Sequence, residues 1–534
     1  MTVKRVLGYV ISGALSDGLR VRLSNAVPLE SIKTGKFVTV AGDTYRYFSL
    51  ITDLQLEVAN QEALQFLPDG PRSMLHQIIC QREMYTTAKI KPMIMLDQHN
   101  RLIPVKTIPP HLVEVSDVDA AEVALIFGQE DGKGSHFCVG YPLDMNTPVC
   151  IDLERFGERS SGVFGKTGTG KTFITRLLLA GLMRYSTTVC LIFDMHSEYG
   201  LQARQEGKDK SFVKGLKTLF PSKVAIFSLD PESTRRRGGM PDVTITIPYT
   251  AVGVADILSL QSELNLHATA LEAAYLIVAK HKEHWLEQLL DQGANLKEFA
   301  EGVGAHPESV AALYRKLKRI ERLPFFVRSN ASRKLSVIDQ MMEYLQRGTS
   351  IVIEFGTFTS SFEYLLIANI ITRRVHAEYM ARTENFLGTQ AAGDEPNKLL
   401  IVIEEAHKFL NTVAAQQTIF GTIAREMRKY YVSLLVVDQR PSGIDPEVLS
   451  QIGTKFIAQL NDEKDISAIL TGSAGANSLK TILAGLDSKK QALVLGHAIP
   501  MPVVIQTREY NQDFYRSLGD LDQKQFDQAL DQIF

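Results

Sequence analysis

The sequence predicts an α/β fold with a parallel sheet, preceded by a small all-β barrel and interrupted by a helical insertion. Short, evenly spaced apolar runs fill the first hundred residues, strand-like and helix-like runs alternate after about residue 111, and residues 251–346 are helical without a good strand. We therefore expect four parts: a barrel at 1–110, an α/β core at 111–250 and 347–510, a helical bundle at 251–346 and a C-terminal segment at 511–534.

The bulk composition is that of a soluble globular protein. The chain has 534 residues, 45% of them hydrophobic and 22% charged, which is too long for one ordinary core. A net charge of −2 gives no global basic field, although a basic lining inside a ring or cleft is compatible with it. The four cysteines show no C-x-x-C spacing, so the sequence predicts neither a disulfide framework nor a zinc site. The N-terminus lacks a signal-peptide core and no apolar run approaches the ~20 residues of a membrane span, so we expect a cytoplasmic protein without membrane contact.

The barrel is predicted from short runs of β-forming residues with Gly, Asp and Ser between them, a pattern typical of a closed sheet. These runs cover residues 6–11, 19–23, 37–41, 46–51, 54–58 and 93–96, with a short helical piece near 61–66. The proline-rich stretch 104–110 predicts a linker to the α/β core.

The α/β core is organised around residues 165–172, which match the phosphate-loop pattern G-x-x-x-x-G-K-[ST] at each fixed position. The segment consists of Gly165, Lys166, Thr167, Gly168, Thr169, Gly170, Lys171 and Thr172. A short apolar run precedes it and a buried-helix pattern follows, so backbone N–H groups and a helix N-terminus would face phosphate oxygens. In this pattern Lys171 reaches the β- and γ-phosphates and the Thr172 hydroxyl binds Mg²⁺. The sequence thus predicts a nucleoside triphosphate site.

Two adjacent acids, Glu404 and Glu405, directly follow the apolar run 398–403. Carboxylates at the end of a buried strand are costly unless a cation or ligand uses them. A phosphate-loop ATPase needs one acid that holds Mg²⁺ through water and one that polarises the attacking water. We assign Glu404 to the metal and Glu405 to the water; the alternative is a strand end with two solvated acids.

A third strand-like run, 434–437, ends in polar residues that include Gln439. Its amide can donate to a phosphate oxygen and accept from water, which suits a sensor of the γ-phosphate. Between the two strands, residues 422–430 form a basic helix end, and an arginine supplied across a subunit boundary would stabilise charge on the transferred phosphoryl group. Arg428 is our first choice and Arg425 the second; solvated or ion-paired arginines are the alternative for either.

With these residues in place, the chain resembles the HerA family of hexameric DNA translocases, within the broader HerA/FtsK group of ring ATPases. The resemblance runs in order through the barrel, the phosphate loop, Asp194 with Glu198-Tyr199, Glu404-Glu405-Ala406-His407, residues 424–430, Gln439-Arg440-Pro441-Ser442 and Gly496-His497-Ala498. The family usually has Asp where Glu404 stands and Gly where Met427 stands.

The resemblance implies a RecA-like, FtsK-like P-loop ATPase core in a homohexamer that encircles double-stranded DNA and pumps it with ATP and Mg²⁺. It implies that Asp194 belongs to the nucleotide site, that the barrel docks a NurA-like nuclease or another effector, and that residues 511–534 brace a neighbouring subunit. DNA end processing and antiphage defence both stay open. Two other classes also stay open: a secretion or conjugation ATPase with the same motor core, and a ring scaffold that activates a partner effector.

A DNA channel would need basic loops, because Lys and Arg that neutralise phosphates supply sequence-independent binding. Arg235, Arg236 and Arg237 combine charge with flanking glycines and are the first candidates. The alternative for every basic run is a solvated surface. The other runs are Lys208, Lys210, Lys214 and Lys217, and then Arg328, Arg333 and Lys334.

Overall fold

The computed structural model of the chain describes residues 4–60, 83–130, 132, 134–204, 212–328, 336–426, 429–472, 476–487 and 490–519. The chain divides into two compact units. Unit 1 contains Met1–Phe156, Val163–Ile174 and Gly453–Glu509, and unit 2 contains Gly157–Gly162, Thr175–Ile452 and Tyr510–Phe534. The helical piece expected near 61–66 lies outside the described residues.

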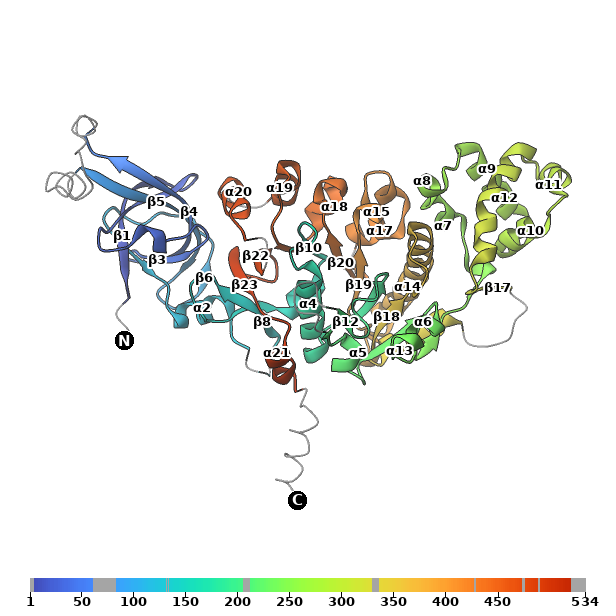
Figure 1. Cartoon of the computed structure of the whole chain (residues 1–534), viewed down its shortest axis with the longest axis horizontal. Coiled ribbons are helices and arrows are strands. Elements are labelled where there is room, and N and C mark those ends of the chain that lie inside the picture. The colour runs from blue at the N-terminus through green and yellow to red at the C-terminus, as the bar shows by residue number, and fades with distance from the viewer. Residues whose placement is uncertain are drawn as a thin grey trace, which may run out of the picture. The chain divides into compact units, whose positions relative to one another are not determined.

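Unit 1 begins with a closed six-stranded barrel, as predicted (Figure 1). The strand order is β2-β1-β7-β3-β4-β5, and pairing of β5 with β2 closes it. The barrel continues past residue 110, because closure requires β7 between β1 and β3. Its strands are β1 (Val6–Ala14), β2 (Gly18–Leu23), β3 (Phe37–Ala41), β4 (Arg46–Val58), β5 (Met84–Leu96) and β7 (Glu114–Asp117), with β6 (Leu102–Ile103) paired to β5.

The rest of unit 1 contains an antiparallel set of strands in the order β21-β22-β23-β8-β9. The strands are β8 (His136–Pro142), β9 (Val149–Asp152), β21 (Thr454–Ile457), β22 (Gln491–Gly496) and β23 (Val503–Thr507). The helices are α2 (Ala120–Phe127), α19 (Glu463–Leu470), α20 (Ala476–Ala484) and the first four residues of α3 (Leu153–Glu158). Helix α2 begins at Ala120 because Asp119 and Glu122 form a capping box there.

Unit 2 contains parallel strands in the order β15-β14-β18-β11-β19-β20, which confirms the predicted α/β core. They are β11 (Val189–Asp194), β14 (Val224–Ser228), β15 (Val243–Thr244), β18 (Ser350–Glu354), β19 (Leu399–Glu404) and β20 (Val432–Asp438). The division between the units runs through β10 (Ser161–Phe164) and α4 (Lys171–Tyr185). Since each pair of neighbouring strands in this order is parallel, the carboxyl ends of these strands share one edge, where ligands bind in such folds.

The predicted helical insertion is present, and α9, α10, α11 and α12 lie together in Figure 1. Trp285 is its buried centre, and its Nε1 donates to the Val252 carbonyl at 2.8 Å. The short pair β16 (Ile247–Pro248) and β17 (Phe326–Val327) lies where the chain enters and leaves these helices. The helices are α7 (Val254–Leu258), α8 (Gln261–Leu264), α9 (Ala268–His281), α10 (Trp285–Asp291), α11 (Leu296–Val303) and α12 (Pro307–Leu317).

The remaining elements of unit 2 include α14 (Ser361–Thr389), a helix of 29 residues. No helix among the described ranges is both long and apolar enough to cross a membrane. The other elements are β12 (Ala203–Arg204), β13 (Phe212–Val213), α5 (Leu216–Leu219), α6 (Pro231–Arg236), α13 (Val337–Gln346), α15 (His407–Leu410), α16 (Ala414–Gln417), α17 (Ile419–Glu426), α18 (Pro446–Gln451) and α21 (Gln512–Ser517).

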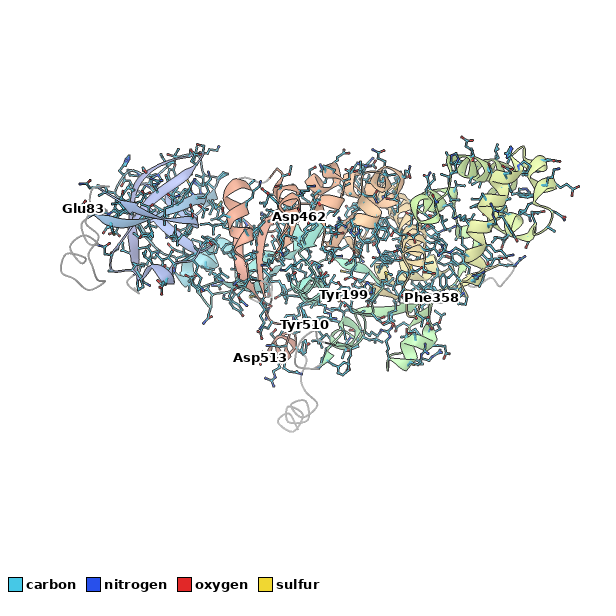
Figure 2. The ribbon with its side chains drawn as sticks, turned by 45° about the horizontal axis from the view of Figure 1, so that its top comes forward. Glu83, Tyr199, Phe358, Asp462, Tyr510 and Asp513 are labelled. Carbon is cyan, nitrogen blue, oxygen red and sulfur yellow. The ribbon has the colours of Figure 1, made fainter. Side chains whose placement is uncertain are left out.

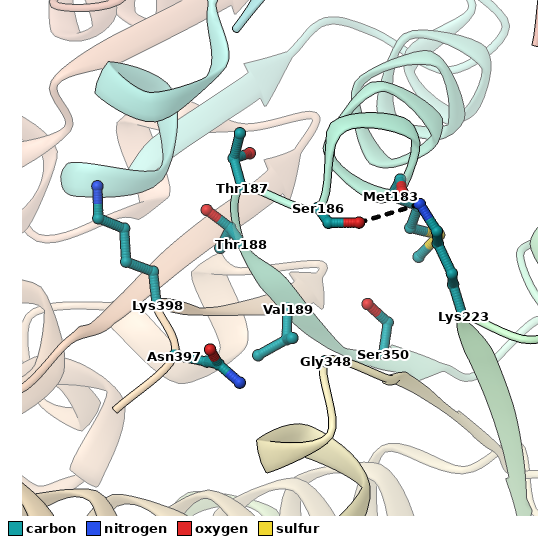
Figure 3. A pocket seen from close by; sticks show the side chains of 10 residues that line it. All are labelled: Met183, Ser186, Thr187, Thr188, Val189, Lys223, Gly348, Ser350, Asn397 and Lys398. Atoms are coloured by element: carbon teal, nitrogen blue, oxygen red, sulfur yellow. Dashed lines mark hydrogen bonds between the residues drawn. The ribbon is translucent and has the colours of Figure 1, made fainter. Parts of the chain in front are cut away.

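A polar cavity of about 60 Å³ lies at the amino ends of β11 and β18 (Figure 3). The Lys223 ammonium donates to the Met183 carbonyl at 2.9 Å, the Arg184 carbonyl at 3.2 Å and the Ser186 hydroxyl at 3.0 Å. Lys223 therefore satisfies carbonyls at the carboxyl end of α4, where a positive charge is favoured by the helix dipole. The cavity is at the opposite end of these strands from the acids described below.

Candidate active site

The phosphate loop joins β10 to α4, and Lys171 is the first residue of the helix. At Gly165 a Cβ would lie 2.8 Å from both the Ala458 Cβ and the Thr169 Oγ1, so a larger residue does not fit. Gly168 (φ +79°) and Gly170 (φ +93°) have left-handed backbones, and a Cβ at either position would meet nothing within 4 Å. The loop thus turns back on itself while its outer side stays open.

Hydrogen bonds within unit 1 hold the loop in this shape. The Lys166 N–H donates to the Gln459 carbonyl at 3.0 Å, and the Thr169 hydroxyl donates to the Lys166 carbonyl at 2.8 Å. The Lys171 ammonium also donates to the Lys166 carbonyl, at 3.1 Å, so it bends back over the loop. An open glycine loop, a helix N-terminus and a lysine over it fit the phosphates of a nucleotide.

In unit 2, four adjacent strands each end in a buried acid. The acids are Glu354 on β18, Asp194 on β11, Glu404 on β19 and Asp438 on β20, and none is more than 9% exposed. Buried carboxylates are costly unless hydrogen bonds or cations offset the loss of hydration. Each of the four has such partners, and the partners differ.

Asp194 organises the turn that follows β11. Its carboxylate accepts from the backbone N–H groups of Glu198 (2.7 Å), Tyr199 (2.8 Å) and Gly200 (3.1 Å). Ser197 within the turn has a left-handed backbone, with φ +57°. The fully buried Asp194 side chain thus positions this turn, and its place in the nucleotide site stays a prediction.

Glu404 is held by two tyrosines. The hydroxyl of Tyr199, a residue labelled in Figure 2, donates to Glu404 Oε1 at 2.6 Å. The Glu404 backbone N–H donates to the Tyr364 hydroxyl at 3.0 Å, and that hydroxyl lies 3.2 Å from the Glu404 carbonyl. Burial raises the pKa of Glu404 to about 8, so a cation beside it would favour the ionised form. These features suit a carboxylate that binds a metal ion.

Glu405 has a different environment from its neighbour. It is about one-third exposed and adopts φ +50°, a left-handed backbone that strains a residue with a Cβ. The Gln439 Nε2 lies 3.4 and 3.5 Å from its two carboxylate oxygens. The structure thus brings together the two residues that the sequence assigned to the attacking water and the γ-phosphate.

His407 and Asp438 form a pair beside Glu405 that the residue patterns did not single out. The His407 Nδ1 lies 2.9 Å from Asp438 Oδ2 and 3.8 Å from Glu405 Oε2. The hydrogen bond with Asp438 raises the pKa of His407. Tyr199, Tyr364 and Asp438 were likewise not assigned roles. The one sequence signal for Tyr199 and Asp438 is that each lies at or near the end of a strand, and Tyr364 has no such signal.

Of the two arginines predicted to act across a subunit boundary, the structure describes Arg425 but not Arg428. Met427 and Arg428 lie outside the described residues, so the first choice keeps its status as a prediction. Arg425 on α17 donates to the Ala415 carbonyl at 2.9 Å, and its Nε lies 3.5 Å from Glu447 Oε2. Arg425 is therefore engaged within its own unit.

The run at 235–237 is not the flexible loop that the sequence predicted. Arg235 and Arg236 lie on α6, and Arg235 pairs with Glu232 at 3.1 Å. The Arg237 Nη2 donates to the fully buried Glu354 carboxylate at 2.7 Å. Arg237 therefore balances the charge of a buried acid, and its assignment to a DNA channel stays a prediction.

Several other basic candidates have partners too. Lys217 pairs with Asp242 at 3.0 Å, Arg328 binds Asp291, and the Lys214 ammonium lies over the Tyr515 ring. Lys208, Lys210, Arg333 and Lys334 lie outside the described residues.

A comparison with protein families matches residues 137–375 to the family described as "Helicase HerA, central domain". Two relatives named "DNA double-strand break repair helicase HerA" extend over most of the chain. The protein of Sulfurisphaera tokodaii is 24% identical over 95% of this chain and 93% of its own length. The protein of Saccharolobus solfataricus is 23% identical over 94% of this chain and 92% of its own length.

Among solved structures, VirB4 of Thermoanaerobacter pseudethanolicus matches with a TM-score of 0.46 and 15% identity, over 71% of this chain and 98% of its own. The bacterial conjugative coupling protein TrwBdeltaN70 matches with a TM-score of 0.48 and 12% identity, over 77% of this chain and 95% of its own.

Proposed function

Because the chain belongs to the HerA family of P-loop ATPases, we propose that it hydrolyses ATP and uses the energy to translocate or unwind double-stranded DNA. The observation that carries hydrolysis is the pair of carboxylates at the end of β19. Glu404 is buried and held by Tyr199, whereas Glu405 is partly exposed, strained and faces Gln439. Two adjacent acids in such different environments suit two different roles.

The proposed roles follow from the chemistry of each residue. Lys171 and backbone N–H groups on the open side of the loop bind the phosphates, and Thr172 and Glu404 would hold Mg²⁺. Mg²⁺, when bound, neutralises charge on the phosphate oxygens. Glu405 orients the attacking water and accepts its proton, and Gln439 keeps that carboxylate in place while its amide responds to the γ-phosphate. Such a site needs no cluster of protein ligands, since Mg²⁺ keeps several waters and phosphate ligands.

The proposed assembly is a cytoplasmic homohexamer around double-stranded DNA. In a ring, Arg428 or Arg425 of a neighbouring copy would stabilise charge on the transferred phosphoryl group. The names of the relatives, which refer to double-strand break repair, support DNA end processing together with a nuclease docked on the barrel. A different effector on the barrel, acting in antiphage defence, is the alternative.

The test measures ATP hydrolysis with and without duplex DNA, together with particle mass in the presence of ATP and DNA. We expect duplex DNA to stimulate hydrolysis, a mass of six copies, and loss of nucleotide binding in Lys171→Ala but not in the exposed control Lys316→Ala. A hydrolysis rate that does not change when duplex DNA is added would favour a secretion or conjugation ATPase that handles protein substrates. Effector activation that survives Lys171→Ala would favour a ring scaffold.

A further inference from the structure

Tyr199 is a buried residue of unit 2 to which the residue patterns assigned no role. It is 0% exposed, and its hydroxyl donates to Glu404 Oε1 at 2.6 Å, a short bond of the kind made to a charged acceptor. Among the described residues, no hydrogen bond is made to the other carboxylate oxygen, Oε2. The hydroxyl of Tyr199 thus occupies one oxygen of the acid and leaves the second for another partner.

The turn that carries Tyr199 is fixed from two sides. Asp194 accepts from three consecutive backbone N–H groups, including that of Tyr199 itself. Arg176, which is 3% exposed and lies on α4, donates to the Glu198 carbonyl through its Nε at 2.8 Å and also through its Nη2. Helix α4 therefore contacts the turn at Glu198, and the next residue, Tyr199, binds Glu404.

The backbone of Glu404 is fixed independently of its side chain. The Tyr364 hydroxyl binds both the N–H and the carbonyl of Glu404, and the Tyr364 ring packs edge-on against Phe355 and Phe409. With the backbone held, the remaining freedom of Glu404 is rotation about its side-chain bonds. A glutamate has one more such bond than an aspartate, so its carboxylate needs an additional contact to keep one orientation.

We propose that Tyr199 is a positioning residue for the metal-binding carboxylate: its hydroxyl selects one orientation of Glu404 and directs Oε2 toward Mg²⁺. This inference rests on the proposed ATPase function. Residues that orient metal ligands in this way contribute about 10- to 100-fold to metal affinity or activity. Through Arg176 and the 194–200 turn, the orientation of Glu404 also depends on the position of α4.

The first experiment compares Tyr199→Phe with Tyr510→Phe. Tyr510, also labelled in Figure 2, is a matched control, since it is a buried tyrosine whose hydroxyl donates to the Lys214 carbonyl at 3.1 Å. Mn²⁺ binding in the presence of a non-hydrolysable ATP analogue is measured by electron paramagnetic resonance, and steady-state hydrolysis is measured in parallel. We expect Tyr199→Phe to weaken Mn²⁺ binding about 10-fold or more and to lower kcat, with the KM for ATP unchanged at saturating metal, whereas Tyr510→Phe behaves as wild type.

A double-mutant cycle separates positioning from general support of the core. Aspartate at position 404 is too short to reach the Tyr199 hydroxyl, so Tyr199→Phe in the Glu404→Asp background should not weaken Mn²⁺ binding further. An equal loss in both backgrounds would overturn the proposal, as would wild-type Mn²⁺ affinity in Tyr199→Phe. If Tyr199→Phe does not fold, Arg176→Lys serves instead, because it loses the double donation to Glu198 and should also weaken Mn²⁺ binding.

The outcome for this inference is distinguishable from that for the proposed function. If wild-type protein binds no nucleotide, the ATPase function falls and the inference falls with it. If wild-type protein hydrolyses ATP but Tyr199→Phe keeps its metal affinity, the positioning role is refuted and the ATPase function stands.

Discussion

Arg237→Ala should destabilise unit 2, because the Arg237 guanidinium is one of two hydrogen-bond donors to a fully buried carboxylate. The other donor to Glu354 is the Thr234 hydroxyl at 2.7 Å, so the variant leaves an uncompensated buried charge. Removing one partner of a buried ion pair costs about 3–5 kcal/mol. Arg237 itself is 29% exposed, which places our estimate at the lower end, about 3 kcal/mol.

The assay is urea unfolding, with Arg235→Ala as the matched control. Arg235 is more than half exposed and pairs with an exposed Glu232, so its loss should change the free energy of unfolding by less than about 1 kcal/mol. Both variants remove one arginine from the same run, and both lower the local charge equally. A DNA-contact role would therefore weaken DNA binding in both, whereas the ion pair predicts a stability loss in Arg237→Ala alone.

The pH dependence gives a second check with a defined sign. Burial raises the pKa of Glu354 even with Arg237 present, and loss of the guanidinium would raise that pKa further. The folded variant then binds a proton more readily than the folded wild type, so the destabilisation should shrink as the pH falls toward the ordinary glutamate range. Equal stability of Arg237→Ala and Arg235→Ala, or a deficit that grows at low pH, would refute the reasoning.

Three further predictions follow from the same structure. Glu405→Gln should bind ATP as wild type does but release no phosphate; loss of nucleotide binding would contradict the assigned role. Gln439→Ala should lower kcat without changing nucleotide affinity, and an unchanged kcat would remove Gln439 from the site. Burial lowers the pKa of Lys455 to about 8, so between pH 8 and 10.5 the unfolded chain binds more protons than the folded chain. Over this range the free energy of unfolding of the wild type should rise by up to about 3 kcal/mol relative to that of Lys455→Met. Identical pH dependence of the two unfolding midpoints would exclude this.

Local sequence patterns were sufficient to predict the fold class. The barrel, the parallel α/β core and the helical insertion each have a periodicity that is visible in a short window, because burial on one face repeats every two residues in a strand and every 3.6 in a helix. The bounds of the barrel depend on strand pairing as well. The strand β7, which closes the barrel, lies beyond residue 110. Its place between β1 and β3 depends on which strands pair and not on the pattern of any one strand.

The phosphate loop and the Glu404-Glu405 pair were predicted because each is contiguous in the sequence, so that local geometry determines its chemistry. The partners of these residues required the tertiary structure. Tyr199 is 205 residues from Glu404, Arg237 is 117 residues from Glu354, and Gln439 is 34 residues from Glu405. Which strand ends become neighbours depends on the order β18-β11-β19-β20, and that order is set by crossover connections that no local pattern encodes.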